Sequence, residues 1–405
     1  LDGMSVSTEG MISVALAALE RAPSNLPVVQ ALRRELTGGG NAWLSAQEVP
    51  QSPYASATSN PYRLRLGRLT DHPDGAMLEY AGEGSLITIA PPGSGKTQCQ
   101  VLPNLALWPG PALVLDVKGE LFRASQRARS AFGPVYRFNP LEPESSHCFN
   151  PLAFVRGHPD YVWEDSAFLA DMLVVQSKSG DQFWDKRAHG ILTAIIADTC
   201  YRFEPEHRSM DSLHAVVNRV DWDEFVARLV ATTDVRSMAE EGSSLMFIEA
   251  KTLDGVLQTL KTSVSPWAGE RVRRATKRCD WTPEGLRASN GTVYICLKTG
   301  EIATYASVLR VFVAMHLRRL MSTLPPSGTV PILFLLDEMP QMQYMPPVVE
   351  AIEVGRQYGI KLWMVAQTEG QIEKHYPDPR GLVGSCAVRC YMNPSLHDGT
   401  AARLA

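Results

Sequence analysis

The chain has 405 residues, which at about 150 residues per domain predicts two or three domains. With 45% hydrophobic and 20% charged residues, its composition is that of a soluble globular protein and excludes wholesale disorder and collagen-like structure. The formal net charge of −4 excludes a uniformly basic surface that would coat nucleic acid, although it allows a local basic channel.

The first 62 residues are expected to form a peripheral segment of helices and linker. Apolar residues at helical spacing predict helices over residues 11–21 and 26–36. A stretch rich in Ser, Pro and Asn over residues 50–61 predicts a linker. The alternation of residues 63–66 then predicts a half-buried strand.

No segment is predicted to cross a membrane or to serve as a signal peptide. The longest useful stretch without Asp, Glu, Lys or Arg, residues 97–115, contains three prolines and would not cross a bilayer as a helix. The first residue is Leu rather than Met, so a natural start and a membrane anchor upstream of it stay open. The seven scattered cysteines indicate free thiols in a reducing compartment.

Short apolar runs predict the strands of an α/β domain. They do not alternate with polar residues, so both faces of each strand are expected to be buried, as in a parallel sheet covered by helices. The runs lie at residues 86–90, 112–115, 135–138, 293–297, 332–336, 362–366 and 387–392. We therefore expect one domain in two sequence pieces, residues 63–155 and 285–405.

The segment between these pieces has helical spacing throughout. The predicted helices cover residues 163–176, 183–203, 212–217, 222–231 and 243–267. We expect residues 156–284 to form an all-α domain inserted into the α/β domain.

The strongest motif, Ala90-Pro91-Pro92-Gly93-Ser94-Gly95-Lys96-Thr97, stands between a predicted strand and a helical stretch. It fits the phosphate-binding pattern G-x-x-x-x-G-K-[ST], except that alanine replaces the first glycine. We expect the backbone of residues Pro92, Gly93, Ser94, Gly95, Lys96 and Thr97 to surround the phosphates of ATP. Lys96 would reach the β- and γ-phosphates, and the Thr97 hydroxyl would bind Mg²⁺. The alternative is a glycine-rich turn with an incidental Lys-Thr pair.

Two carboxylates follow the apolar run at residues 332–336. Asp337 is predicted to hold the Mg²⁺ ion, and Glu338 to accept a proton from the attacking water. Taken alone, an Asp-Glu pair after a strand is more often a polar turn. Together with the phosphate-binding motif, the pair favours ATP hydrolysis.

Three further polar positions are candidates at the ends of predicted elements. Gln367 follows the run at 362–366 and would sense the γ-phosphate or orient water. Arg356 precedes the same strand and would act in trans on the nucleotide of a neighbouring subunit, or be a solvated helix end. Asp116 follows a third run and is either a ligand at the carboxyl end of its strand or the cap of the next helix.

Seven segments in order resemble the coupling-protein ATPases of type IV secretion and conjugation, the TraG/conjugative DNA transfer family. The resemblance covers most of residues 63–400. Besides the phosphate-binding motif, it rests on residues Leu115–Leu121, Phe149–Leu152, Gln182–Asp185, Leu336–Glu338, Gly355–Gly359 and Val365–Gln367.

The resemblance implies a RecA-like P-loop ATPase domain, with its sensor strand between the first and third strands, and an inserted all-α domain. It implies a hexameric motor on the cytoplasmic face of the bacterial inner membrane that uses ATP and Mg²⁺. Such a motor would recruit DNA–relaxase complexes or effector proteins to a secretion channel. Two features depart from the family: the usual pair of N-terminal transmembrane helices is missing from this chain, and the chain stops at Ala405, soon after the last strand.

DNA binding stays open at the level of sequence. A basic run would contact DNA phosphates or form a solvated face; it comprises Arg271, Arg273, Arg274, Lys277 and Arg278. Trp163, Trp184 and Trp267 are expected in the core rather than stacked on bases. Two other functions remain possible: a double-stranded DNA translocase of the chromosome- or phage-packaging type, and a docking adaptor that binds nucleotide and effectors without hydrolysis.

Overall fold

The computed structural model describes residues 60–68, 76–174, 182–219, 221–394 and 400. The helices predicted at residues 11–21 and 26–36 lie outside these ranges. The chain divides into two compact units, and the unit of residues 58–67 and 80–405 holds the whole candidate site. The strand β1 (Leu64–Arg68) confirms the prediction at 63–66, whereas β2 (Met77–Tyr80) was not predicted.

Seven strands form one parallel sheet in the order β5-β6-β4-β7-β8-β3-β9. The α/β prediction and all seven predicted strands are thereby confirmed. The strands are β3 (Leu86–Ile89), β4 (Ala112–Asp116), β5 (Val135–Phe138), β6 (Thr292–Cys296), β7 (Ile332–Leu336), β8 (Ile360–Ala366) and β9 (Val388–Tyr391).

The order of the strands is the one that the RecA-like resemblance implies. Trp363 in the middle of β8 lies opposite Leu86 of β3 on one side and Leu335 of β7 on the other. The strand before Gln367 therefore lies between the strand of the phosphate-binding motif and the strand of the two carboxylates. Because the strands are parallel, the residues that follow these three strands meet at one edge of the sheet.

Each face of the sheet carries its own layer of helices. On one face, α3 (Leu102–Leu107) and α4 (Glu120–Arg129) cover every second residue of the strands, in a cluster that includes Val114, Leu335 and Trp363. On the other face lie α13 (Ile302–Leu320), α14 (Pro346–Val354) and α15 (Glu369–His375). The helices α12 (Pro283–Ala288) and α16 (Pro379–Gly384) complete this part of the chain. The sheet is therefore buried on both faces, as the apolar runs predicted.

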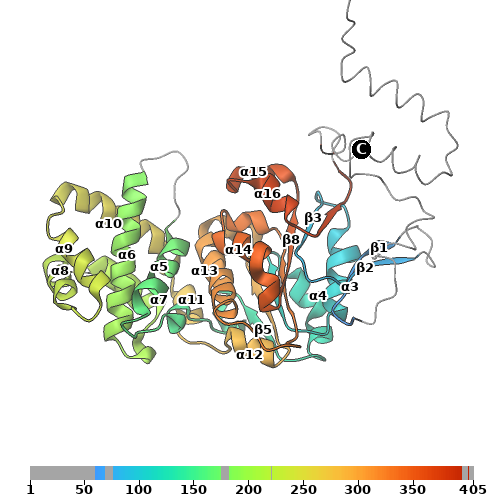
Figure 1. The fold of residues 1–405 in the computed structure, drawn as a ribbon, viewed down its shortest axis with the longest axis horizontal. Helices are drawn as coiled ribbons and strands as arrows, with labels where there is room; N and C mark the ends of the chain where they lie inside the picture. The colour runs from blue at the N-terminus through green and yellow to red at the C-terminus, as the bar shows by residue number, and fades with distance from the viewer. Residues whose placement is uncertain (1–59, 69–75, 175–181, 220, 395–399, 401–405) are drawn as a thin grey trace, which may run out of the picture. The chain divides into compact units, whose positions relative to one another are not determined.

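The middle of the chain is helical in the part that the structure describes, which confirms the predicted helical insertion. Its helices are α5 (Val162–Leu173), α6 (Gln182–Arg202), α7 (Met210–Arg219), α8 (Trp222–Ala231), α9 (Arg236–Leu245), α10 (Ala250–Val264) and α11 (Glu270–Ala275). In Figure 1 the helices α6 to α10 lie together as a group, and α5 packs against both α6 and α13. The boundaries predicted at 155 and 284 stay predictions, and α12 runs across the second of them.

The prediction of one helix over residues 243–267 is wrong. The helix α9 ends at Leu245, and the backbone at Glu249 is extended, with φ −67° and ψ 140°, before α10 begins. The two helices have different main partners, because α9 packs chiefly against α8 and only to a lesser extent against α6, whereas α10 packs against α6; a single straight helix would not bury both apolar faces. At the other end, Pro266 lies in a separate 3₁₀ turn after α10.

The three tryptophans and most of the basic run at residues 271–278 make contacts within this chain. Trp267 is buried, and Trp163 and Trp184 pack partly buried against the same core, as predicted. Four arginines of the run bind groups of this chain: Arg271 the carbonyl of Leu141, Arg273 the carboxylates of Asp211 and Glu270, Arg274 that of Glu144, and Arg278 that of Asp280. Within the described ranges, no helix is both long and apolar enough to cross a membrane.

Candidate functional site

The loop after β3 has the backbone that a phosphate-binding loop needs. Gly93 and Gly95 have positive φ angles of 78° and 84°, which glycine adopts without steric cost. The chain then enters a helical turn at Thr97–Val101 that continues into α3. Ala90, which replaces the first glycine of the pattern, continues the strand: its N–H donates to the carbonyl of Ala366 at 2.9 Å. It has no positive φ, so the position does not require glycine.

Three predicted side chains from distant parts of the sequence meet at the carboxyl edge of the sheet. Lys96 Nζ lies 3.4 Å from Glu338 Oε1. Gln367 Nε2 donates to both carboxylate oxygens of Glu338 at 2.9 Å. Glu338 itself is only 4% exposed, and its backbone is left-handed, with φ 56° and ψ 39°. The carboxylate of Glu338 is thus fixed by a cation and an amide in a site largely closed to water.

Asp337 stands beside this group and carries an unsatisfied atom. Its side chain is 5% exposed, and its Oδ1 has no hydrogen-bond partner among the described residues. Burial raises the pKa of Asp337 to about 6, and the neighbouring Glu338 carboxylate adds to the rise, while Lys96 opposes it. A buried carboxylate oxygen without a partner is costly for the folded protein.

Two more buried oxygens at the same edge also lack partners within the described part of the chain: Ser94 Oγ in the glycine-rich loop and Asp116 Oδ1 at the end of β4. A hard cation such as Mg²⁺ takes carboxylate and hydroxyl oxygens as ligands, and phosphate oxygens accept bonds from hydroxyls and backbone N–H groups. The unpartnered oxygens and the two left-handed glycines therefore fit a nucleotide with Mg²⁺. Thr97 and Asp337 would hold the ion, and the loop from Pro92 to Thr97 would hold the phosphates.

The two carboxylate oxygens of Asp116 differ in their contacts. One oxygen, Oδ2, accepts the backbone N–H of Phe122 at 2.8 Å and so satisfies a free donor in the first turn of α4. The other oxygen has no partner in the ranges that the structure describes, and burial raises the pKa of the carboxyl. Asp116 therefore caps a helix and also adds negative charge beside Asp337.

Arg356 lies away from this group, within its own subunit. It is exposed in the short 3₁₀ turn Gly355–Tyr358, directly before β8 begins, whereas Gln367 follows the end of β8. Seven strand residues separate the two positions, a length of about 20 Å at about 3.3 Å per residue. Arg356 therefore cannot serve the site of its own chain, and the two other predictions stay open: a role toward a neighbouring subunit, or a solvated helix end.

Sequence reasoning missed the residue that orients Gln367. Gln371 Oε1 accepts the backbone N–H of Gln367 at 3.0 Å, and the hydroxyl of Thr368 accepts the N–H of Gln371 at 3.3 Å. Thr368 is the residue that caps α15, so its cap and the glutamine three residues later form a small network at the edge of the site. The sequence pattern that predicts this network is a threonine followed three residues later by a glutamine.

A family model described as "Type IV secretory system Conjugative DNA transfer" matches residues 62–403. The chain belongs to this family. Among curated relatives of this coupling-protein family, it is 24% identical to the conjugal transfer protein TraG of Escherichia coli, with 96% of this chain and 66% of TraG aligned. It is 27% identical to the protein VirD4 of Agrobacterium fabrum, over 78% of this chain and 48% of VirD4. The chain thus spans about half to two thirds of the length of these relatives.

Solved structures of a coupling protein share the fold. The plasmid coupling protein TrwB in complex with ADP and Mg²⁺ superposes with a TM-score of 0.63 at 15% identity, covering 85% of this chain and 76% of TrwB. TrwB in complex with the ATP analogue ADPNP gives the same TM-score at 14% identity, over 79% and 73% of the two chains. The family member described here therefore has a TrwB-like P-loop fold with a helical segment inserted in its middle.

Proposed function

We propose that this coupling protein hydrolyses ATP to deliver DNA–relaxase complexes or effector proteins to a type IV secretion or conjugation channel. The observation that carries the proposal is the meeting of Lys96, Glu338 and Gln367 beside the unpartnered carboxylate of Asp337. A binding-only adaptor would not need a buried base fixed by two other side chains. Membership of the family, and the ADP and Mg²⁺ bound to TrwB, support the same function.

Each side chain has a role that follows from its position. Lys96 lies at 3.4 Å from Glu338 and exchanges this partner for a phosphate oxygen when nucleotide binds. Glu338 then accepts the proton of a water molecule at its carboxylate, while Gln367 holds that carboxylate in place and relays its state to β8. Thr97 and Asp337 would hold Mg²⁺, which would supply positive charge to the phosphates.

The active assembly is proposed to be a homo-hexamer on the cytoplasmic face of the bacterial inner membrane, joined to the membrane through a segment outside this chain. Arg356 would then enter the site of a neighbouring subunit, because its exposed position lies at the edge of the sheet opposite its own site.

Mixed assemblies test this role of Arg356. If Arg356→Ala subunits are added to wild-type protein in increasing proportion, we expect the ATPase rate to fall more steeply than the fraction of wild-type subunits, because each variant subunit disables a neighbour's site. Arg380→Ala, which removes an exposed arginine of α16, is the control and should leave the rate unchanged. A strictly linear fall with Arg356→Ala would exclude the trans role.

Transfer in the parent bacterium tests the function itself. Replacement of Lys96 by Ala is expected to reduce delivery of DNA or effectors below detection, because the phosphates lose their cation. The exposed Arg127→Ala on α4 should transfer like the wild type. Undiminished transfer by the Lys96 variant would overturn the proposal. DNA-stimulated turnover with steep salt dependence, but no effect on effector delivery, would instead favour a double-stranded DNA translocase.

A further inference from the structure

Arg310 is a buried arginine on α13 that joins two parts of the chain. Its side chain is 4% exposed and has no carboxylate partner among the described residues. Nε and Nη2 donate to the backbone carbonyl of Met172, at 3.2 and 3.1 Å, and Nη1 donates to Gln343 Oε1 at 3.0 Å. Arg310 thus binds one residue of the helical insertion and one residue that follows the catalytic carboxylates.

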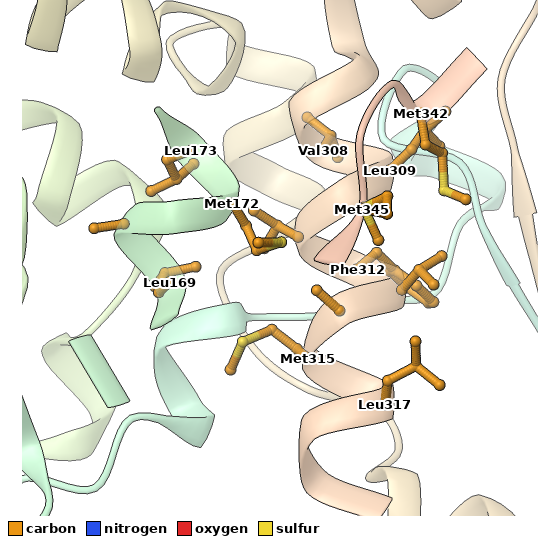
Figure 2. Close-up of a cluster of buried hydrophobic side chains, with 14 of the residues drawn as sticks. Leu169, Met172, Leu173, Val308, Leu309, Phe312, Met315, Leu317, Met342 and Met345 are labelled. Atoms are coloured by element: carbon orange, nitrogen blue, oxygen red, sulfur yellow. The ribbon is translucent and has the colours of Figure 1, made fainter. Parts of the chain in front are cut away.

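The contact with Met172 lies at the C-terminal end of a helix of the insertion. Met172 lies in the last turn of α5, where backbone carbonyls have no partner within the helix. The forked guanidinium of Arg310 supplies two donors to that carbonyl and so holds the end of α5 against α13. Figure 2 shows Met172 and Leu173 of α5 on one side of α13, in the same buried cluster as Leu309 and Phe312.

The contact with Gln343 holds a segment with unusual backbone angles. The segment begins at Glu338, which is left-handed, and reaches Gln343, with φ 64° and ψ −153°, a region that is almost exclusive to glycine. A non-glycine residue stays in such a conformation only where its surroundings determine it. Here Met342 and Met345, which precede and follow Gln343 in the chain, are buried in the same cluster as side chains of α13 (Figure 2), and Arg310 binds the Gln343 side chain.

The segment between these two residues is short and internally bonded. Gln341 N–H donates to the carbonyl of Glu338 at 2.9 Å, and Gln343 N–H donates to that of Pro340 at 3.0 Å. A displacement of Gln343 is therefore passed to Glu338 through one compact turn. Two clefts, of about 380 and 430 Å³, are both lined by Arg310 and Gln343 and leave room for such a displacement.

We infer that Arg310 is a positioning residue that couples the last turn of α5 in the helical insertion to the backbone that carries the Glu338 carboxylate. The inference rests on the proposed function, because it links the helical insertion to the proposed ATPase site. The link is the Arg310 side chain, which bonds to Met172 in the insertion and to Gln343 beside the site. A change at the nucleotide moves Glu338, the turn after it and Gln343, and Arg310 passes this movement to Met172. A change imposed on α5 by a bound substrate travels the same path in reverse.

Hydrogen exchange in the full chain tests the coupling without requiring hydrolysis or an identified substrate. In the wild type, the amides of the last turn of α5 are expected to exchange at severalfold different rates with Mg²⁺-ADP and with the ATP analogue ADPNP. In Gln343→Gly this difference should disappear, because glycine keeps the backbone conformation and lacks the acceptor for Arg310. Nucleotide affinity, and the exchange difference around Lys96, should stay as in the wild type.

Two further variants separate coupling from general stability. Arg310→Lys keeps the charge but cannot bind Met172 and Gln343 together, so it should also lose the difference at α5. Arg319→Lys changes an arginine of the same helix that pairs with Glu284, and it should behave like the wild type. Gln343→Asn, which tolerates positive φ but is one carbon shorter, replaces Gln343→Gly if the glycine variant does not fold.

The outcomes distinguish this inference from the function on which it rests. If the wild type binds no nucleotide, the proposed function fails and the coupling fails with it. If nucleotide binds and α5 does not respond, or responds equally in Gln343→Gly and Arg310→Lys, the coupling alone is overturned. Loss of the response in both variants, with nucleotide affinity retained, supports it.

Discussion

Replacement of Glu338 by Gln is expected to lower the rate of ATP hydrolysis by about 10²–10⁴-fold, the usual contribution of a positioned general base. The amide keeps the size of the carboxylate and can still bond to Gln367, but it cannot take a proton from water. Nucleotide affinity should be unchanged or higher, because Lys96 no longer pairs with a carboxylate at 3.4 Å. Phosphate release and equilibrium binding, measured on the same preparations, check both parts.

The matched control is Glu373→Gln, which removes an exposed carboxylate from α15 and should retain wild-type turnover. Turnover by Glu338→Gln within a few-fold of the wild type would mean that another group accepts the proton. Loss of nucleotide binding together with turnover would mean that Glu338 builds the pocket rather than performing the chemistry.

Replacement of Asp337 by Asn is expected to stabilise the nucleotide-free protein while abolishing its Mg²⁺-dependent hydrolysis. In the folded state the pKa of Asp337 is raised to about 6 from 3.8, chiefly by burial. Ionisation therefore costs the folded state up to about 3 kcal/mol at pH 8, at about 1.4 kcal/mol per pKa unit. Urea unfolding at pH 8 should show Asp337→Asn more stable than the wild type by about 1–3 kcal/mol.

The stability difference between Asp337→Asn and the wild type should depend on pH in a definite direction. The folded-state pKa lies above the unfolded one, so the contribution of Asp337 is most favourable below pH 4 and is lost as the pH rises through about 6. The stability gap between variant and wild type should therefore close on lowering the pH toward 4. The exposed Asp223→Asn should show no such gap. If Asp337→Asn is less stable than the wild type at pH 8, then the ionised Asp337 carboxylate does not destabilise the nucleotide-free protein, and a bound cation would have no such destabilisation to relieve.

The strands were predictable because burial on both faces leaves an unambiguous sequence pattern. Runs such as Leu113–Leu115 and Leu333–Leu336 contain no polar residue, and the structure buries each of them. The phosphate-binding motif was recognisable for a different reason: the left-handed backbone at Gly93 and Gly95 needs glycine, so the spacing of the glycines records the shape of the loop.

The sequence predicted which side chains of the site would lie near one another, but not which atoms would bond. Parallel strands bring residues 96, 338 and 367 to one edge, but the pairing of Gln367 with both oxygens of Glu338 depends on the left-handed backbone at Glu338. No local pattern predicts a non-glycine residue in that conformation, because tertiary contacts impose it. The same holds for Gln343 and its bond to Arg310, which joins residues 33 positions apart.

The break between α9 and α10 was missed because each half has good helical spacing. Periodicity reports that a segment has an apolar face, but not that two successive faces have different main packing partners. Leu245 is buried at the end of α9, and Phe247, two residues later, is 85% exposed. The change from one partner to the next is a property of the packed insertion and not of the segment itself.

The central claim is that the edge of the sheet carrying Lys96, Asp337 and Glu338 is an ATP-hydrolysing site. The most direct test is the steady-state release of phosphate from ATP, with and without Mg²⁺, by the wild type and by Lys96→Ala over a range of protein concentrations. We expect saturable, Mg²⁺-dependent release by the wild type that rises per subunit as the protein assembles, and none by the variant. Equal release by both proteins, or none by the wild type at any concentration, would contradict the account.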